Sequence, residues 1–328
     1  MAQALRKHSQ STQGKRAQAP RVQDKGWTVR RAGTVQIITA NSLTALPWLV
    51  HGFSTRPGGV SRLNGERVLN LGFTEWDARK NVAQNHLRFL RSLGAERMKL
   101  ISLRQIHSDL ARVFTAAPPE TQAATQIEPL RGDAAITQLS GVMLTVQAAD
   151  CVPILLVDRT QRAAAAVHAG WRGTLARVAE KTLGRMRFEF GTQPREVIVA
   201  LGPAIGRCCY DVGPEVAKDF ASQFAQAAEW FDGPFERLAG GDEPNPLPWL
   251  TMMPPGHQPP PERVQLDLRA ANRWQLISAG VLPKHITVSS LCTACRTDLL
   301  FSYRREGPRT GRMMAAVGIK KNMRQQNR

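Results

Sequence analysis

Two residues that bind metals well, Cys151 and His168, lie at the two ends of one apolar segment. Between them, the apolar runs 152–157 and 163–167 flank the polar residues 158–161, a pattern that predicts the two strands of a β-hairpin. If residues 158 and 161 face each other, position n pairs with 319 − n and Cys151 lies opposite His168. Directly opposed residues hold their Cβ atoms about 4.5–5.5 Å apart, so a thiolate and an imidazole could share one metal ion. A longer turn would shift the pairing but leave both residues at the same end of the hairpin.

A third candidate ligand, His107, follows the run 98–106, which predicts another strand. Two histidines and one cysteine form a three-ligand zinc site with an open fourth position, which is typical of catalytic zinc. The same ligand set also suits copper. Without a metal, Cys151 could act as a nucleophile with His168 as its base. The simplest alternative is that Cys151 is a small buried hydrophobe and that both histidines have ordinary core roles.

Several short motifs resemble those of the YfiH-type laccase-domain family. In chain order they are H-G-F-S-T-R at 51–56, L-N-L-G at 69–72, Q-I-H at 105–107, A-D-C-V-P at 149–153, V-H-A-G-W-R-G at 167–173, L-G-P-A-I-G-R-C-C-Y at 201–210 and F-S-Y-R-R at 301–305. The resemblance runs from about residue 50 to residue 319, and the pair A-D-C-V-P with H-A-G-W-R-G is highly specific.

This resemblance implies a function and a cofactor. The family was first named for polyphenol oxidation and is now regarded as zinc-dependent purine nucleoside phosphorylases with adenosine deaminase activity. Its metal ligands fall on His107, Cys151 and His168, the three residues reached above from their chemistry. Purine nucleosides (adenosine, inosine and 5′-methylthioadenosine) and phosphate are the expected partners, with zinc preferred to copper because the sequence contains no H-x-H pair, which multicopper sites typically use.

Phosphorolysis also requires a phosphate site. Arg172 follows the expected ligand His168 by four residues and precedes a helix expected from Gly173 onward. A helix N-terminus together with a guanidinium favours a dianion. Arg56, beside two glycines, and Tyr303, near the C-terminal end, are further candidates for contact with phosphate or substrate. Asp133 either orients a ligand or caps a turn, and capping is the simpler interpretation.

The composition indicates a protein with a substantial core and no membrane segment. The 328 residues are 42% hydrophobic, and no apolar run approaches the about 18 residues of a membrane span. Five cysteines, an odd number, favour free thiols in a reducing compartment, and we expect a cytoplasmic location. The adjacent Cys208 and Cys209 are interpreted as packing residues. The C-x-x-C at 292–295 is interpreted as structural, because it has no second pair with which to bind zinc.

The net charge of +18 is concentrated near the two ends, because residues 1–31 and residues 304–328 each carry a net +7. Basic tails of this kind bind nucleic acid weakly or remain solvated. A basic nucleic-acid-binding protein without catalysis is therefore an alternative, but no nucleic-acid-binding module is recognisable and we expect no specific nucleic-acid partner. The oligomeric state stays open.

Strands and helices mix without strict βαβ alternation, which predicts an α+β fold; the resemblance narrows this to a single-domain, layered α/β sandwich with mixed β-sheets. We expect a disordered basic tail over 1–30, the catalytic domain over 31–319 with a Pro/Gly-rich insertion over 233–262, and a basic C-terminal tail over 320–328. Helices are expected from a cap at Asp77 to Leu93, after Gly173, from Pro214, and from Asp267 to Ala279.

Overall fold

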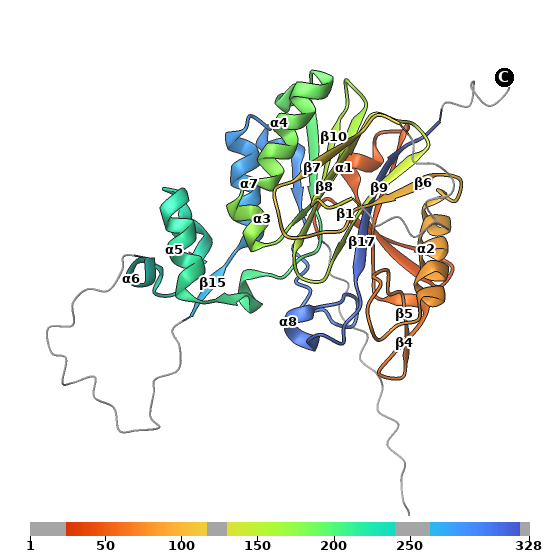
Figure 1. The fold of residues 1–328 in the computed structure, drawn as a ribbon, viewed down its shortest axis with the longest axis horizontal. Helices are drawn as coiled ribbons and strands as arrows, with labels where there is room; N and C mark the ends of the chain where they lie inside the picture. Colours follow the sequence, from red (N-terminus) through yellow and green to blue (C-terminus); the bar gives the residue numbers. More distant parts are fainter. Residues whose placement is uncertain (1–23, 117–129, 240–262, 322–328) are drawn as a thin grey trace, which may run out of the picture.

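The computed structural model describes residues 24–116, 130–239 and 263–321, and two six-stranded sheets form its centre (Figure 1). The first sheet has the spatial order β1 (Trp27–Ala32), β2 (Val35–Ala40), β3 (Leu49–Ser54), β17 (Met313–Ile319), β9 (Val142–Ala148) and β6 (Lys99–Ser102). The second has the order β16 (Ile286–Val288), β12 (Val197–Leu201), β10 (Val152–Asp158), β11 (Ala163–Ala169), β8 (Ala134–Thr137) and β7 (Ala111–Phe114). Most neighbouring strands are antiparallel, but β6 and β9, β7 and β8, and β12 and β16 pair in parallel, so both sheets are mixed as predicted.

Smaller elements complete the fold. Two small sheets are formed by β13 (Asp211–Val212), β15 (Val264–Leu266) and β14 (Phe231–Asp232), and by β4 (Pro57–Leu63) and β5 (Glu66–Val68). The α-helices are α1 (Asn41–Thr44), α2 (Arg79–Leu93), α3 (Trp171–Leu175), α4 (Val178–Phe190), α5 (Pro214–Gln223), α6 (Phe235–Ala239), α7 (Leu268–Ser278) and α8 (Tyr303–Glu306). None of the helices within the described ranges is long and apolar enough to cross a bilayer.

The hairpin of β10 and β11 lies in the middle of the sandwich and is buried on both faces. One set of alternating residues, including Leu155 and Ala166, packs against the first sheet. The other set, including Ile154 and Val167, packs with residues of α4 and α7. Helix α2 covers the far face of the first sheet, where Phe89 and Leu90 are buried. Burial on both faces explains why these strands are continuously apolar rather than alternating, and it confirms the predicted layered sandwich.

The hairpin register differs from the predicted one. Pro153, not Cys151, pairs with His168, and β10 position n pairs with 321 − n. The turn is longer than assumed because the buried Asp158 pairs with Ala163, and its carboxylate accepts hydrogen bonds from the backbone N–H groups of residues 160 and 161. The sequence analysis expected a longer turn to leave Cys151 and His168 at the same end of the hairpin, and this is what the observed register shows.

Three helix and boundary predictions need correction. Helix α2 has no side-chain cap, because Asp77 accepts hydrogen bonds from Ser61, Asn70 and Asn81 instead. The helix expected after Gly173 is two helices, α3 and α4, separated by Arg177 in a left-handed conformation (φ 61°). The predicted N-terminal tail is too long, since β1 begins at Trp27. Helices α5 and α7 occur as predicted, α7 with Asp267 as its N-cap.

Parts of the predicted tails and insertion lie outside the described residues, namely 1–23, 240–262 and 322–328. Residues 117–129 also lie outside the described ranges. Within the described portion, Asp24 accepts hydrogen bonds from the Ser289 hydroxyl at 2.7 Å and the Ser290 N–H at 2.9 Å. The first part of the predicted insertion contains the short helix α6, and β17 ends at Ile319, where the domain was expected to end.

Candidate metal centre

The β10–β11 hairpin brings Cys151 and His168 to the same end of the second sheet. Cys151 immediately precedes β10, and His168 is the second-last residue of β11. His168 pairs with Pro153, so Cys151 lies diagonally across the ladder from it rather than directly opposite. Diagonal neighbours remain within reach of long side chains. The hairpin therefore supplies two of the three predicted ligands, as expected.

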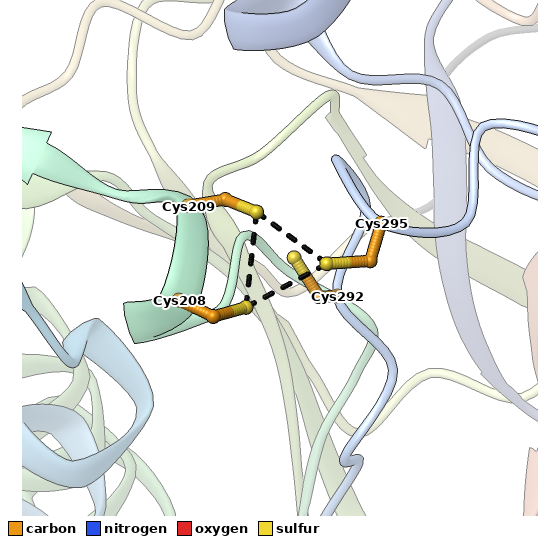
Figure 2. Close-up of side chains that lie close together, drawn as sticks. All are labelled: Cys208, Cys209, Cys292 and Cys295. Atoms are coloured by element: carbon orange, nitrogen blue, oxygen red, sulfur yellow. Dashed lines mark hydrogen bonds between the residues drawn. The ribbon is translucent and has the colours of Figure 1, made fainter.

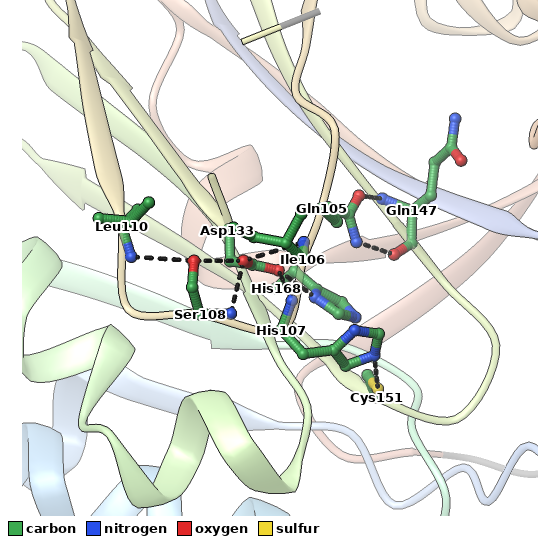
Figure 3. Close-up of polar contacts among 9 residues, drawn as sticks. All are labelled: Gln105, Ile106, His107, Ser108, Leu110, Asp133, Gln147, Cys151 and His168. Carbon is green, nitrogen blue, oxygen red and sulfur yellow. Dashed lines mark hydrogen bonds and ion pairs between the residues drawn. The ribbon is translucent and has the colours of Figure 1, made fainter. Parts of the chain in front are cut away.

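His107 reaches the same place from the loop between β6 and β7 (Figure 3). Two sets of hydrogen bonds shape this loop. The Gln105 side chain exchanges two 2.7 Å hydrogen bonds with the backbone N–H and C=O of Gln147 at the end of β9. The Asp133 carboxylate accepts the backbone N–H groups of residues 106, 107 and 108 at 2.7–3.2 Å, as well as the Ser108 hydroxyl at 2.7 Å. These contacts hold His107 in a left-handed backbone conformation (φ 58°) that is uncommon for a residue other than glycine.

Asp133 also contacts His168, and this corrects the preference for a capping role. Its Oδ1 atom lies 2.9 Å from His168 Nδ1. Both side chains are buried, with exposed fractions of 0% and 4%. A carboxylate on one ring nitrogen fixes the ring orientation and leaves Nε2 available, which is the usual arrangement behind a metal-ligating histidine. The Asp133 carboxylate thus orients His168 directly, and it also holds the backbone of the loop that carries His107.

The three ligand atoms are spaced for a single ion. They lie within 4.8 Å of one another. Cys151 Sγ is 3.9 Å from His107 Nε2, and the two imidazoles meet edge to face with centroids 4.9 Å apart. Tetrahedral zinc with bonds of about 2.3 Å to sulfur and 2.0–2.1 Å to nitrogen would separate those atoms by about 3.6 Å, so the donor set fits zinc with only small adjustments.

Charge coupling within the trio favours a thiolate. Burial alone would raise the pKa of Cys151, but the His168 charge and a hydrogen bond from His107 lower it to about 6. Burial alone would lower the pKa of His168, but Cys151 and Asp133 raise it to about 9. Hydrogen bonds from His168 and Ser108 overcome the effect of burial on Asp133 and hold its pKa at about 2. The thiol is therefore prepared as an anion, the form in which cysteine binds metals.

We expect Asp133→Asn to weaken metal binding by about 10- to 100-fold, the range typical of losing a group that orients a ligand. The amide keeps the size of the side chain but loses the charge that fixes the His168 ring. Competition with a chromophoric chelator would measure the dissociation constant. Asp219→Asn is the matched control, because Asp219 is exposed on α5. Equal affinities in the two variants would contradict this role for Asp133.

Gly170 is required where the two loops meet. A Cβ atom at this position would lie 2.8 Å from Cys151 Sγ and 3.1 Å from the His107 ring, closer than side chains tolerate. We therefore expect Gly170→Ala to displace both side chains and to lower metal occupancy while the protein remains folded. Gly184→Ala, in α4, is the control because no atom lies within 4 Å of its added Cβ. Metal content and circular dichroism of both variants would check this; full occupancy in Gly170→Ala would contradict it.

The predicted phosphate and substrate residues occupy different environments. Arg172 is exposed, with its guanidinium 4.2 Å from the centre of the Trp171 ring. Gly173 lies inside α3, which begins at Trp171 with Gly170 as N-cap, so the helix starts two residues before the expected start at Gly173. Arg56 is buried and forms an ion pair with Glu306. Tyr303 begins α8 and is 49% exposed, and the Arg312 guanidinium lies 5.7 Å from the centre of its ring.

Four residues near the trio complete its surroundings: Arg304, which the sequence suggested could close the site from the C-terminal end, and three that were not singled out, Asp150, Tyr210 and Arg312. Asp150, next to Cys151, has φ 98°, and its carboxylate accepts hydrogen bonds from the Thr293 hydroxyl and the Arg304 N–H, both at 2.6 Å. Burial and then the Cys151 charge raise the pKa of Tyr210, while Arg304 and Arg172 oppose the rise. Burial lowers the pKa of Arg312, against the effects of Tyr303, Asp150 and Cys151. Tyr210, Arg304 and Arg312 therefore share the electrostatic environment of Cys151. The available signal for Asp150, Tyr210 and Arg304 was their presence in the quoted motifs, whereas Arg312 lies outside them.

Comparison with known proteins agrees with the motifs. A model of the family described as multi-copper polyphenol oxidoreductase laccase matches residues 50–320. The chain is 32% identical over 270 residues to the purine nucleoside phosphorylase YlmD of Geobacillus stearothermophilus, covering 82% of this chain and 89% of that protein. It is 31% identical over 269 residues to the adenosine deaminase RL5 of an unknown prokaryotic organism, covering 82% and 93%.

Solved structures share the fold. The hypothetical protein YfiH of Bacillus licheniformis superposes with a TM-score of 0.74 and 27% identity, covering 89% of this chain and 99% of that one. The structure of YlmD from Geobacillus stearothermophilus gives 0.72 and 29%, with the same coverage. Sequence, fold and the extent of the match together confirm the resemblance, and the chain belongs to the multi-copper polyphenol oxidoreductase laccase family, that of the YfiH-type laccase-domain proteins.

Proposed function

We propose that this protein is a zinc-dependent purine nucleoside phosphorylase that also deaminates adenosine. One observation carries the proposal: two imidazoles and a thiol converge within 4.8 Å, with Asp133 behind one imidazole. The names of its relatives, purine nucleoside phosphorylase and adenosine deaminase, support the two activities. Adenosine, inosine and 5′-methylthioadenosine are the proposed nucleosides, and the five free thiols suit a reducing, cytoplasmic location.

His107, Cys151 and His168 would hold the zinc ion. When bound in such a three-ligand site, zinc supplies a Lewis acid and lowers the pKa of a coordinated water to about 7. The protein's own contribution is to orient the ligands. Asp133 keeps the Nδ1 proton of His168 in place, so that Nε2 faces the site.

Phosphorolysis joins a phosphate oxygen to C1′ of the ribose and breaks the bond from C1′ to the base, which leaves with a proton. Arg172 is proposed to hold the phosphate, because its guanidinium is exposed and its electrostatic influence reaches Tyr210 beside Cys151. Gly173 contributes backbone N–H in the same first turn. Tyr303 presents an exposed aromatic ring beside Arg312, a surface suited to a purine. Arg56 remains a candidate, although its ion pair with Glu306 occupies part of its guanidinium.

Copper-dependent phenol oxidation is the second candidate, favoured by the family's description. Two other imidazoles are engaged elsewhere, which argues for zinc rather than a multicopper centre. Burial lowers the pKa of His51 to about 4, and its Nε2 accepts the Ala40 N–H, while His86 bonds to the Leu71 carbonyl. In the described residues, groups of three or more potential ligands occur only at the trio and at a set of four cysteines. Among the described residues, no further imidazoles are therefore grouped with the trio to form a multicopper centre.

The deciding experiment is incubation of the purified protein with adenosine, with and without phosphate, followed by product identification and metal analysis. We expect adenine and ribose 1-phosphate only with phosphate, inosine and ammonia without it, and loss of both reactions after chelation. Copper together with oxygen-dependent phenol turnover would support the second candidate. Turnover that survives chelation but stops after thiol alkylation would instead indicate a Cys–His hydrolase.

A further inference from the structure

The other four cysteines converge at a second place (Figure 2). Cys208 and Cys209 lie in the 3₁₀ helix Arg207–Cys209 after β12, and Cys292 and Cys295 follow β16. Their four sulfur atoms lie within 4.8 Å of one another. The adjacent pair therefore lies beside the C-x-x-C motif, for which the sequence suggested no second pair. Cys209 also packs against the buried residues Ile205, Cys292 and Ala294, as its interpretation as a packing residue predicted.

The sulfur spacing matches four ligands around one ion. Cys209 and Cys295 are 3.4 Å apart, Cys208 and Cys295 3.6 Å, and Cys208 and Cys209 3.7 Å. Tetrahedral zinc with bonds of about 2.3 Å would separate its sulfurs by about 3.8 Å. A disulfide would require about 2.03–2.05 Å. An iron–sulfur cluster places several irons and sulfides between its thiolates and needs a wider spacing than this set offers.

The surrounding backbone is arranged for thiolates. The Gly206 N–H donates to Cys292 Sγ at 3.2 Å, and a Cβ at Gly206 would lie 3.2 Å from Cys208 Sγ. The two loops are fixed to each other, because the Thr293 N–H donates to the Ala204 carbonyl at 3.1 Å. Cys208 and Cys295 are exposed, which gives an ion access from solvent, while Cys292 is buried.

We propose that Cys208, Cys209, Cys292 and Cys295 bind one zinc ion, separate from the His107–Cys151–His168 trio. Binding replaces up to four thiol protons with one Zn²⁺ and leaves a four-thiolate complex of net charge −2. Four protein ligands leave no open position, so the site is structural rather than catalytic. The proposal does not depend on the proposed enzymatic function.

The four-cysteine site is joined to the candidate metal centre through Asp150. Thr293, between the two cysteines of the C-x-x-C motif, donates its hydroxyl to the Asp150 carboxylate at 2.6 Å. The Ile205 N–H, from the loop before Cys208, donates to the Asp150 carbonyl at 2.8 Å. Both contacts hold Asp150 at φ 98°, directly before Cys151. Zinc in the four-cysteine site would therefore stabilise the backbone that presents Cys151.

The test uses the full-length Cys151→Ala variant, in which the four remaining cysteines are those of the proposed site. After removal of metal under reducing conditions, one sample of the protein is titrated with Zn²⁺ and a separate metal-free sample with Co²⁺, which binds such sites more weakly. We expect about one tightly bound zinc per chain, protection of all four thiols from alkylation, and an intense thiolate-to-cobalt charge-transfer band. Chelation should make the thiols reactive again.

A second variant separates loss of the site from general misfolding. Adding Cys295→Ser to Cys151→Ala changes one exposed ligand, and we expect zinc affinity to fall and the charge-transfer band to weaken while circular dichroism stays unchanged. Three results would each overturn the zinc assignment: thiols that stay unprotected in excess Zn²⁺, a disulfide among the four cysteines that persists under reducing conditions, or stoichiometric iron in the protein as purified.

Discussion

Cys151→Ala is expected to remove the metal from the candidate centre and to lower both phosphorolysis and deamination by at least about 10²- to 10³-fold, the effect of losing a main electrostatic contributor in an active site. Its thiol would be the anionic ligand of the trio, since its pKa is lowered to about 6. Without it, the two imidazoles keep their positions but lose the negative charge that balances the ion. The hydrogen bond of Asp133 to His168 should remain.

Metal content and turnover measured on the same sample check this prediction. If the four-cysteine site binds zinc, total zinc should fall from about two ions per chain to about one rather than to none. Cys151→Ser serves as a comparison of similar size with a much weaker ligand, and should lose activity for the same reason. Wild-type turnover in either variant would exclude Cys151 from the chemistry. Loss of turnover with unchanged metal content would favour a nucleophilic role.

The sequence was sufficient to bring Cys151 and His168 together because the hairpin places both at one end. His107 was added from its chemistry and the family motif, and it lies in the loop after β6 rather than at the end of a strand. The prediction for Cys151 and His168 survived an incorrect register: a shift of two residues preserves the face on which a strand side chain lies, because the side-chain period is two. The error came from the length of the turn, which the Asp158 carboxylate stabilises by accepting hydrogen bonds from the backbone N–H groups of residues 160 and 161. Such local side-chain bonds depend on burial that sequence periodicity does not show.

The residue roles that could not be predicted from the sequence are those that depend on contacts between segments far apart in the chain. Asp133 was interpreted as a cap because its sequence neighbours form a turn, yet its bonds reach residues 106–108 and His168. The second cysteine pair was missed for the same reason, since Cys209 and Cys295 come together only when the loops after β12 and β16 meet. Those strands pair in parallel, which brings the segments following them to the same edge of the sheet.

Arg172 remains the candidate for phosphate binding, but the structure changes the physical reason: the helix N-terminus contributes less than the sequence suggested. Helix α3 begins at Trp171 and has only five residues, and the Thr174 N–H already bonds to the Gly170 carbonyl at 2.8 Å. The helix dipole is therefore a minor contribution, and the guanidinium must supply most of the attraction. The Arg172 guanidinium lies 4.2 Å from the centre of the Trp171 ring, a cation–π contact that uses none of its hydrogen-bond donors.

Arg172→Ala should spare zinc binding and reduce phosphorolysis about 10- to 150-fold, which corresponds to losing a charge-assisted contact of about 1.5–3 kcal/mol. Deamination consumes water rather than phosphate, so its rate should fall much less. The ratio of hypoxanthine release from inosine plus phosphate to deamination of adenosine without phosphate measures the difference. Arg185→Ala is the matched control, because Arg185 pairs with Glu189 on the surface of α4. If both reactions of Arg172→Ala decline equally at full zinc content, Arg172 supports the scaffold and phosphate binds elsewhere.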